Sequence, residues 1–204
     1  MQNLQVALSE RVTVFDRARG GLFVLCGDPS VHMIAYDFVK KPLANHRVIT
    51  VIDGGNVFDP YVVTRMAHGL GQDPKTFLSR ILISRSFTCH QTHALTRKVL
   101  ASFNAHQFPL ILVLGLLTTF YDEEVPIAER RQLLEKTLHD LKEIARRGTK
   151  VLITSPDPQS AAPAPMSKLL LDAADAAVRL DPESDGLSLT VLKEVPEPVA
   201  VAQR

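Results

Sequence analysis

The chain has 204 residues, 46% of them hydrophobic and 22% charged, a composition typical of one globular domain with a substantial core. The formal net charge of +1 excludes a global basic field for nucleic acid but leaves room for a local basic patch. The N-terminus has no secretory pattern, and the apolar run 109–117 is too short to span a bilayer. We therefore expect a cytoplasmic protein without membrane contact, in which Cys26 and Cys89 are free thiols.

Short apolar runs alternate with helical patterns in the first half of the chain. Apolar or β-branched runs predict buried strands, and Pro following Asp marks the start of a helix. Ser30 is the expected N-cap of the first helix. In chain order, the predicted elements are a strand at 22–26, a helix at 31–42, a strand at 48–52, a helix from Asp59-Pro60 to about His68, a short helix from Asp73-Pro74 and a strand at 81–83.

The second half contains the longest helical pattern. Between Pro126 and Arg147, leucine and isoleucine recur at three- and four-residue spacing, and Gly148 ends the helix. The Pro- and Ala-rich segment 155–165 predicts a mobile loop. In chain order, the predicted elements are a helix at 88–104, strands at 110–114, the helix at 126–147, a strand at 151–154, and strands at 177–180 and 187–192 joined by a turn.

Continuous apolar strands separated by helices predict an α/β fold with a mostly parallel central sheet and helices on both faces. The last two strands are close in sequence, so they predict an antiparallel hairpin at one edge of the sheet. No linker divides the chain. We expect a single domain over residues 1–198 and a disordered tail beyond it at 199–204, with disorder beginning after Glu194.

Several ordered segments narrow the fold. Residues 48–95 combine a strand ending in Ile52-Asp53, an aromatic at Phe58, a Pro-led helix and the pair His90-Gln91. Together with residues 110–134, 151–158 and 172–198, they resemble RecA/RadA recombinases and their KaiC-like relatives. The resemblance covers residues 15–198 and implies a RecA-like, P-loop NTPase-type domain of three layers.

The resemblance places the phosphate-binding loop at residues 27–34. A P-loop needs glycines for the close approach of its backbone to phosphate, a Lys for the phosphates and a Ser or Thr for Mg²⁺. Gly27 matches the first glycine, but His32, Met33 and Ile34 stand at the second glycine, the Lys and the Ser/Thr. Asp28 adds a carboxylate that would repel phosphate.

Two further catalytic positions differ from the family pattern. The Walker B Asp, which helps to hold Mg²⁺, matches Gly115, and the Glu that polarises water matches Gly55. Asp53 lies at the end of a predicted strand, where it could cap the following loop or take part in chemistry. We expect a degenerate paralogue with no ATPase activity and no cofactor.

The positions of the family's DNA-binding loops argue against DNA contact there. Residues 122–124 are Asp-Glu-Glu, and the segment 155–165 has no basic residue. Backbone phosphates bind Lys and Arg, so these loops disfavour nucleic acid. The remaining basic residues are typical of a solvated helix face: Arg130, Arg131, Arg146, Arg147 and Lys150.

Other constellations have ordinary interpretations. Cys89, His90 and His93 supply too few ligands for a zinc site unless the fold adds His68 or His106, so we expect no metal. Cys26 ends a predicted buried strand and is expected in the core. Phe15 and Ala18 have the spacing with which recombinases dock on a neighbouring subunit, but ordinary packing explains so short a pattern equally well.

Three functions remain open. The first is a non-catalytic paralogue that binds a protein partner or forms a homo-oligomer, as an accessory factor in recombination, DNA repair or the stress response. SulA-like proteins, which inhibit a protein by binding it, are a precedent of this kind. The second is a ligand-binding or enzymatic domain that uses Asp28, Ser30, His32 and Asp53. The third is ATP-independent DNA binding through Arg130, Arg131, Arg146 and Arg147.

Overall fold

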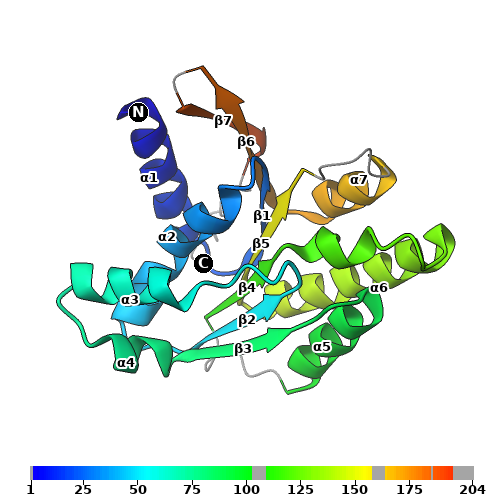
Figure 1. Cartoon of the computed structure of the whole chain (residues 1–204), viewed down its shortest axis with the longest axis horizontal. Helices are drawn as coiled ribbons and strands as arrows, with labels where there is room; N and C mark the ends of the chain where they lie inside the picture. The colour runs from blue at the N-terminus through cyan, green and yellow to red at the C-terminus, as the bar shows by residue number, and fades with distance from the viewer. Residues whose placement is uncertain (1, 103–108, 158–163, 185, 195–204) are drawn as a thin grey trace, which may run out of the picture.

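The computed structural model describes residues 2–102, 109–157, 164–184 and 186–194. Seven strands form one sheet in the order β3-β2-β4-β5-β1-β6-β7, shown in Figure 1. The first six strands are parallel to their neighbours, and β7 pairs with β6 in the antiparallel sense. The strands are β1 (Gly21–Gly27), β2 (Ile49–Asp53), β3 (Ile81–Arg85), β4 (Leu110–Leu114), β5 (Lys150–Pro156), β6 (Ala176–Glu183) and β7 (Gly186–Lys193).

Helices cover both faces of this sheet, so the domain has three layers (Figure 1). One face carries α1 (Gln2–Arg17), α2 (Val31–Ala44), α3 (Pro60–Gly69) and α4 (Pro74–Leu78). The other face carries α5 (Cys89–Ala101), the 3₁₀ helix η1 (Leu116–Phe120), α6 (Ile127–Arg146) and α7 (Ala164–Ala173). No described helix is both long enough and apolar enough to cross a membrane.

The central strands alternate between two hydrophobic cores, because successive side chains of a strand point to opposite faces. In β4, Leu110, Leu112 and Leu114 join the core under α2, whereas Ile111 and Val113 join the core under α6. All five are at most 1% exposed. Burial on both faces explains why these strands are continuous apolar runs in the sequence.

The expected α/β architecture is confirmed: the sheet is mostly parallel, with helices on both faces and the antiparallel hairpin at one edge. Each expected strand forms, and several run one to three residues beyond the predicted ends. The assignment of residues 1–198 to one domain stays a prediction. The tail after Glu194, the C-terminal end of the predicted helix 88–104, and residues 158–163 of the expected loop lie outside the described residues.

Two α-helices, α1 and α7, and the 3₁₀ helix η1 were not predicted. The predicted loop 155–165 overlaps the start of α7, in which Met166 and Leu170 lie four residues apart and are almost fully buried. Pro165 fits there because the first turn of a helix needs no N–H donor from proline. In the described part of α1, Phe15 is the one fully buried side chain, so its pattern lacks a broad apolar stripe.

Candidate functional site

The candidate site lies where β1, β5 and β4 end side by side. The order of strands changes direction in sequence across this part of the sheet, and ligands of open α/β sheets bind outside the carboxyl ends of strands at such a point. The connections that leave this edge are the β1–α2 loop, the β2–α3 loop and the turn from β4 into η1. The residues that the sequence assigned to the former nucleotide pocket lie on these connections, at the last residues of β1 and β2, or in the first turn of α2.

The β1–α2 loop is a tight turn whose backbone donors are bonded within the protein. The Asp28 N–H donates to Leu180 O at 2.8 Å, Val31 N–H to Asp28 O at 3.0 Å and His32 N–H to Pro29 O at 3.2 Å. The Ser30 N–H donates to Oδ1 of Asp28 at 2.8 Å. Since proline has no N–H, every backbone donor from residue 28 to residue 32 has a partner inside the chain.

Asp28, and not Ser30, supplies the side-chain bond at the start of α2, so the expected N-cap role of Ser30 is wrong. Ser30 has helical backbone angles, and its hydroxyl is buried without a hydrogen-bond partner among the described residues. The hydrogen bond from the Ser30 N–H lowers the pKa of the Asp28 carboxyl, so that the group is an anion at neutral pH. A competing aspartate two residues earlier can satisfy the same N–H through an Asx turn.

Gly27 closes this turn against the neighbouring strand. Its φ is +103°, and an added Cβ would lie 2.0 Å from the carbonyl oxygen of Leu180. Any larger residue would therefore collide with the backbone of β6. Gly27 O also accepts the N–H of Asp157 at 2.7 Å, which ties the end of β5 to the same turn.

A hydrogen-bonded chain links three positions of the candidate site. Nδ1 of His32 lies 2.8 Å from Oγ1 of Thr154, and Gly115 N–H donates to the same oxygen at 3.0 Å. Desolvation by burial lowers the pKa of His32, while the carboxylate of Asp53 opposes the shift. A neutral His32 imidazole accepts the Thr154 O–H at Nδ1, and Thr154 Oγ1 in turn accepts the Gly115 N–H, so all three groups are hydrogen-bonded.

Gly115 and Gly55 meet backbone to backbone. Gly115 has φ +62° and ψ 44°, the left-handed region that glycine favours. An added Cβ would lie 2.8 Å from Gly55 Cα and 2.9 Å from Gly55 N. The N–H groups of Gly54 and Gly55 both donate to Leu114 O, at 2.9 and 3.0 Å. The turn after β2 is thus joined to the end of β4 at Gly55 and Gly115.

Asp53 holds the β2–α3 loop. The carboxylate is fully buried, and its two oxygens accept the N–H groups of Val57 at 3.0 Å and Phe58 at 3.1 Å. The guanidinium of Arg85, at the end of β3, lies 3.4 Å from Oδ2. Asp53 therefore caps the β2–α3 loop, which was one of the two roles that the sequence allowed for it.

Large apolar side chains stand exposed on the loops of this edge. Met33 is 50% exposed in the first turn of α2, Phe87 is 67% exposed between β3 and α5, and Tyr61 is 71% exposed in the first turn of α3. Val57 adds a fourth at 36%. Ile34, by contrast, packs against the core under α2.

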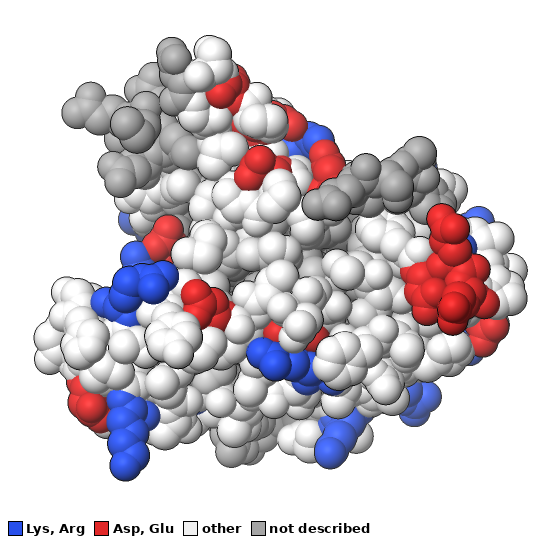
Figure 2. Space-filling model, viewed as in Figure 1, with Lys and Arg blue, Asp and Glu red and all other residues white. Residues whose placement is uncertain are grey.

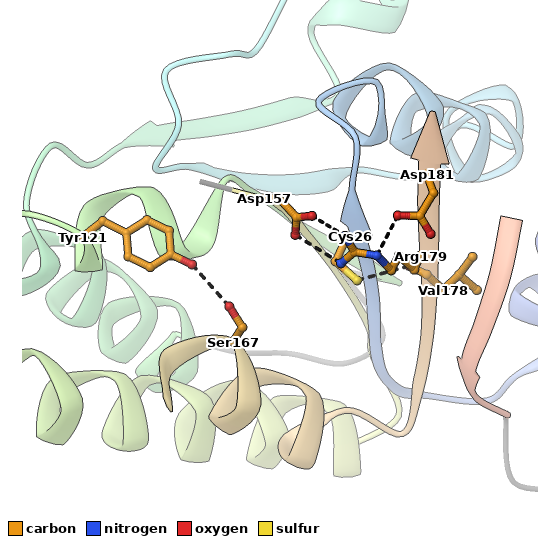
Figure 3. A network of polar contacts seen from close by, with 7 residues as sticks. All are labelled: Cys26, Tyr121, Asp157, Ser167, Val178, Arg179 and Asp181. Carbon is orange, nitrogen blue, oxygen red and sulfur yellow. Dashed lines mark hydrogen bonds and ion pairs between the residues drawn. The ribbon is translucent and has the colours of Figure 1, made fainter. Parts of the chain in front are cut away.

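A clasp around Arg179 was not predicted from the sequence. Its guanidinium pairs with both carboxylate oxygens of Asp157, and Nε donates to Asp181 at 2.8 Å (Figure 3). The clasp connects β6 to the end of β5. Beside it, the Sγ of Cys26 lies 3.6 Å from Val178 O, and burial raises the pKa of this thiol to about 11. Cys26 is thus a core thiol, as expected, and is poorly reactive at neutral pH.

An acidic turn follows η1, at the same edge of the sheet as the β1–α2 and β2–α3 loops. Figure 2 shows acidic side chains gathered over the connection between η1 and α6, where Asp122, Glu123 and Glu124 lie. None of these three carboxylates has a Lys, Arg or His partner within 4.0 Å among the described residues. This turn is therefore a negatively charged surface.

The basic residues of α6 do not form one solvated face. Arg130 is 7% exposed and donates to Phe120 O at 3.2 Å, so it fastens α6 to η1. Arg131 pairs with Glu135 along the helix. The hypothesis of a DNA surface made of Arg130, Arg131, Arg146 and Arg147 is therefore wrong for Arg130, which is buried, and stays a prediction for the other three residues.

The other sequence candidates are dispersed or internal. His90 contacts Glu129 at 2.9 Å and His93 contacts Thr137 at 3.4 Å, and no three potential ligands gather at metal-binding distance in the described part of the chain. His106 lies outside the described residues. Phe15 is buried against Phe23 and Phe38, with ring centroids 4.8 and 5.0 Å away, so it packs inside its own domain.

Comparison with known proteins agrees with this architecture. The Rad51 family model matches residues 14–168, which is most of the chain. The crystal structure of the RadB recombinase superposes with a TM-score of 0.67 and 18% sequence identity, over 89% of this chain and 84% of that one. The match to RadB supports the fold, and the family match extends from α1 into α7. The chain belongs to the Rad51 family.

Proposed function

We propose that this protein is a Rad51-family domain that does not hydrolyse Mg-ATP and acts by binding another protein, as an accessory factor in recombination or DNA repair. The observation that carries the proposal is the internal hydrogen bonding of the β1–α2 loop. A phosphate cradle needs free backbone N–H groups. From residue 28 to residue 32, each such group is bonded within the chain, and the Asp28 carboxylate lies at the same turn.

The side chains at the family's catalytic positions also do not fit Mg-ATP. Met33 carries no charge for the β- and γ-phosphates, and Ile34 has no hydroxyl for Mg²⁺. Gly55 and Gly115 have no carboxylates, and at Gly115 an added Cβ would lie 2.8 Å from Gly55 Cα, so a side chain there needs movement of the backbone. We derive no catalytic step through a nucleotide from these residues.

The exposed apolar residues of the same edge support a protein partner. Contiguous exposed apolar surface on a soluble protein marks an interaction site, and aromatic and Met side chains are enriched in interfaces. Met33, Tyr61 and Phe87 are all at least half exposed and lie in the segments that follow β1, β2 and β3 at one edge of the sheet. The acidic turn at 122–124 would favour a partner surface that carries Lys or Arg.

The alternative of a small-molecule site in the altered pocket has less support. Asp53 is occupied by two backbone donors, and His32 by Thr154. An apolar cavity of about 40 Å³ lies instead between α1, β1 and β6, next to Phe15 and Val178, and it is too small for a nucleotide.

The proposal is tested by affinity capture from native extract. Wild-type protein is compared with a variant that carries Met33→Glu and Phe87→Ser, and with a control that carries Leu82→Ser. Leu82 is also half exposed, but it lies on the edge strand β3. We expect recombination or repair proteins to be recovered by the wild type and the control and lost with the double variant. Recovery that is equal for all three proteins would contradict the proposed surface.

A further inference from the structure

The amino-terminal ends of the parallel strands form a second edge of the sheet, opposite the candidate site. This edge is rich in basic residues although the net charge of the chain is only +1. Arg17 and Arg19 precede β1, and Arg146, Arg147 and Lys150 lie at the start of β5. We define the basic edge as Arg17, Arg19, Lys41, Arg146, Arg147 and Lys150.

Contacts between the turns bring these residues together. The carbonyl oxygen of Arg19 lies 3.8 Å from the position of a Cβ built on Gly148, and Gly21 N–H donates to Thr149 O at 3.3 Å. These contacts place the turn before β1 against the turn before β5. Lys150 Nζ donates to Asp16 O at 2.8 Å, and Asp16 pairs with Lys41 at 3.0 Å, which adds the end of α2.

The positive charge of this edge is only partly neutralised. Three carboxylates lie nearby: Asp16 pairs with Lys41, Glu143 pairs with Arg146 and Arg147, and Asp175 accepts the N–H of Leu22. Six cations therefore face three anions. Three of the paired side chains remain accessible, at 60% exposure for Lys41, 66% for Arg146 and 46% for Arg147. Lys150 is half-buried, with its ammonium 5.0 Å from the centroid of the Phe15 ring, and contributes charge more than direct contact. Arg17 and Arg19 are exposed, and neither has an ion pair with the described residues.

The cations form a row and not a pocket. Arg47 and Arg80, whose guanidinium donates to Leu43 O, lie on the turns before β2 and β3, so described cations occur at the starts of β3, β2, β5 and β1, and residues 103–108 before β4 lie outside the described part of the chain. At the usual strand spacing, the four intervals from β3 to β1 span roughly 19 Å, a length that matches about six phosphates of one strand at the 3.4 Å spacing of a duplex. Cations are favoured at the C-termini of helices, which accounts in part for Lys41, Arg146 and Arg147. This preference does not account for the other cations of the same edge, which are Arg17, Arg19, Arg47 and Arg80.

We propose that this basic edge binds the phosphate backbone of nucleic acid without ATP. An acidic protein is the weaker alternative, because a protein interface needs apolar anchors and the most exposed ones, Tyr61 and Phe87, lie at the opposite edge. The site is separate from the loops after β4 and β5, where the sequence is acidic or lacks basic residues. Arginine suits the edge because its planar group binds phosphate through two hydrogen bonds.

The test is fluorescence polarisation of the full chain with a labelled 30-nucleotide single strand and the matching duplex, from 50 to 300 mM salt. The test variant carries Arg17→Glu and Arg19→Glu, whose side chains make no ion pair in the described structure. The control carries Arg97→Glu and Lys136→Glu, the same charge change in the groove between α5 and α6. Thermal unfolding shows that all three proteins are folded.

We expect the wild type to bind, with a Kd that weakens steeply as salt rises. The test variant should bind at least ~10-fold more weakly, with a salt slope lower by about 1.8 on the duplex if both arginines contact phosphates. The control should stay within about 3-fold of the wild type. Equal loss in test and control variants, absence of wild-type binding at 50 mM salt, equal competition by poly-glutamate, or preference for anionic lipid vesicles would each overturn the proposal.

Discussion

The contact between Gly115 and Gly55 gives a quantitative prediction for Gly115→Ala. Gly115 has φ +62°, where a non-glycine residue costs about 1–2 kcal/mol. The new Cβ would lie 2.8 Å from Gly55 Cα, both atoms belong to hydrogen-bonded turns, and neither can move alone. Overpacking of this kind costs about 1–3 kcal/mol. The two effects together predict a loss of about 2–5 kcal/mol in the free energy of unfolding.

Gly71→Ala is the matched control. Gly71 has nearly the same backbone angle, φ +64°, but a Cβ there would meet nothing within 4 Å. Urea unfolding followed by circular dichroism should show that Gly115→Ala costs about 1–3 kcal/mol more than Gly71→Ala, the part due to the collision. Equal losses for the two variants would refute the close approach of the two turns and the argument that it excludes a Walker B carboxylate.

Three further predictions concern the same edge of the sheet. Asp53→Asn should lower the free energy of unfolding by about 1.5–3 kcal/mol, measured in urea, because two backbone N–H groups lose a charged acceptor; an unchanged midpoint would contradict the loop-capping role. The pKa of His32 is lowered in the folded state, so the contribution of this residue to stability is present above the unfolded pKa of about 6.5 and is lost as the pH falls through the folded pKa. The variant His32→Gln should therefore show a smaller fall in melting temperature between pH 7 and pH 5 than the wild type. An unaltered fall would contradict this role of His32. With a pKa of about 11, Cys26 should react with a thiol reagent at pH 8 only after unfolding, and rapid labelling of the native protein would contradict its burial.

The sheet could be predicted from the sequence because its strands are buried on both faces. A run such as Leu110–Leu114 is typical of a strand that is buried on both faces, as in the centre of an α/β sheet. The helix α7 was hidden by its Pro- and Ala-rich start, and its signal was the four-residue spacing of Met166 and Leu170. Such a short apolar pattern is informative only when the face that it packs against is known.

The residues of the candidate site could be found from the sequence, but their contacts could not. Asp28 and Ser30 are both good partners for the first turn of a helix, and the choice between them depends on the path of the chain out of β1. The approach of Gly115 to Gly55 joins residues 60 positions apart and leaves no local pattern. The same holds for the pairing of Arg179 with Asp157 across β6 and β5.

The distribution of charge over the surface could not be predicted from the sequence either. The net charge of +1 does not reveal that one edge of the sheet carries Arg17 and Arg19 and that the opposite edge carries Asp122 and Glu124. The two edges become visible only when the strand order places the turns before β1 and β5 side by side. They would allow one protein to contact nucleic acid and a protein partner at the same time.

The central claim is the absence of ATP chemistry, and isothermal titration of the wild-type protein with Mg-ATP tests it most directly. At millimolar nucleotide we predict no heat of binding and no phosphate release above the buffer rate. Saturable binding with micromolar Kd, together with a hydrolysis rate that disappears in Asp53→Asn while the fold is retained, would contradict the account.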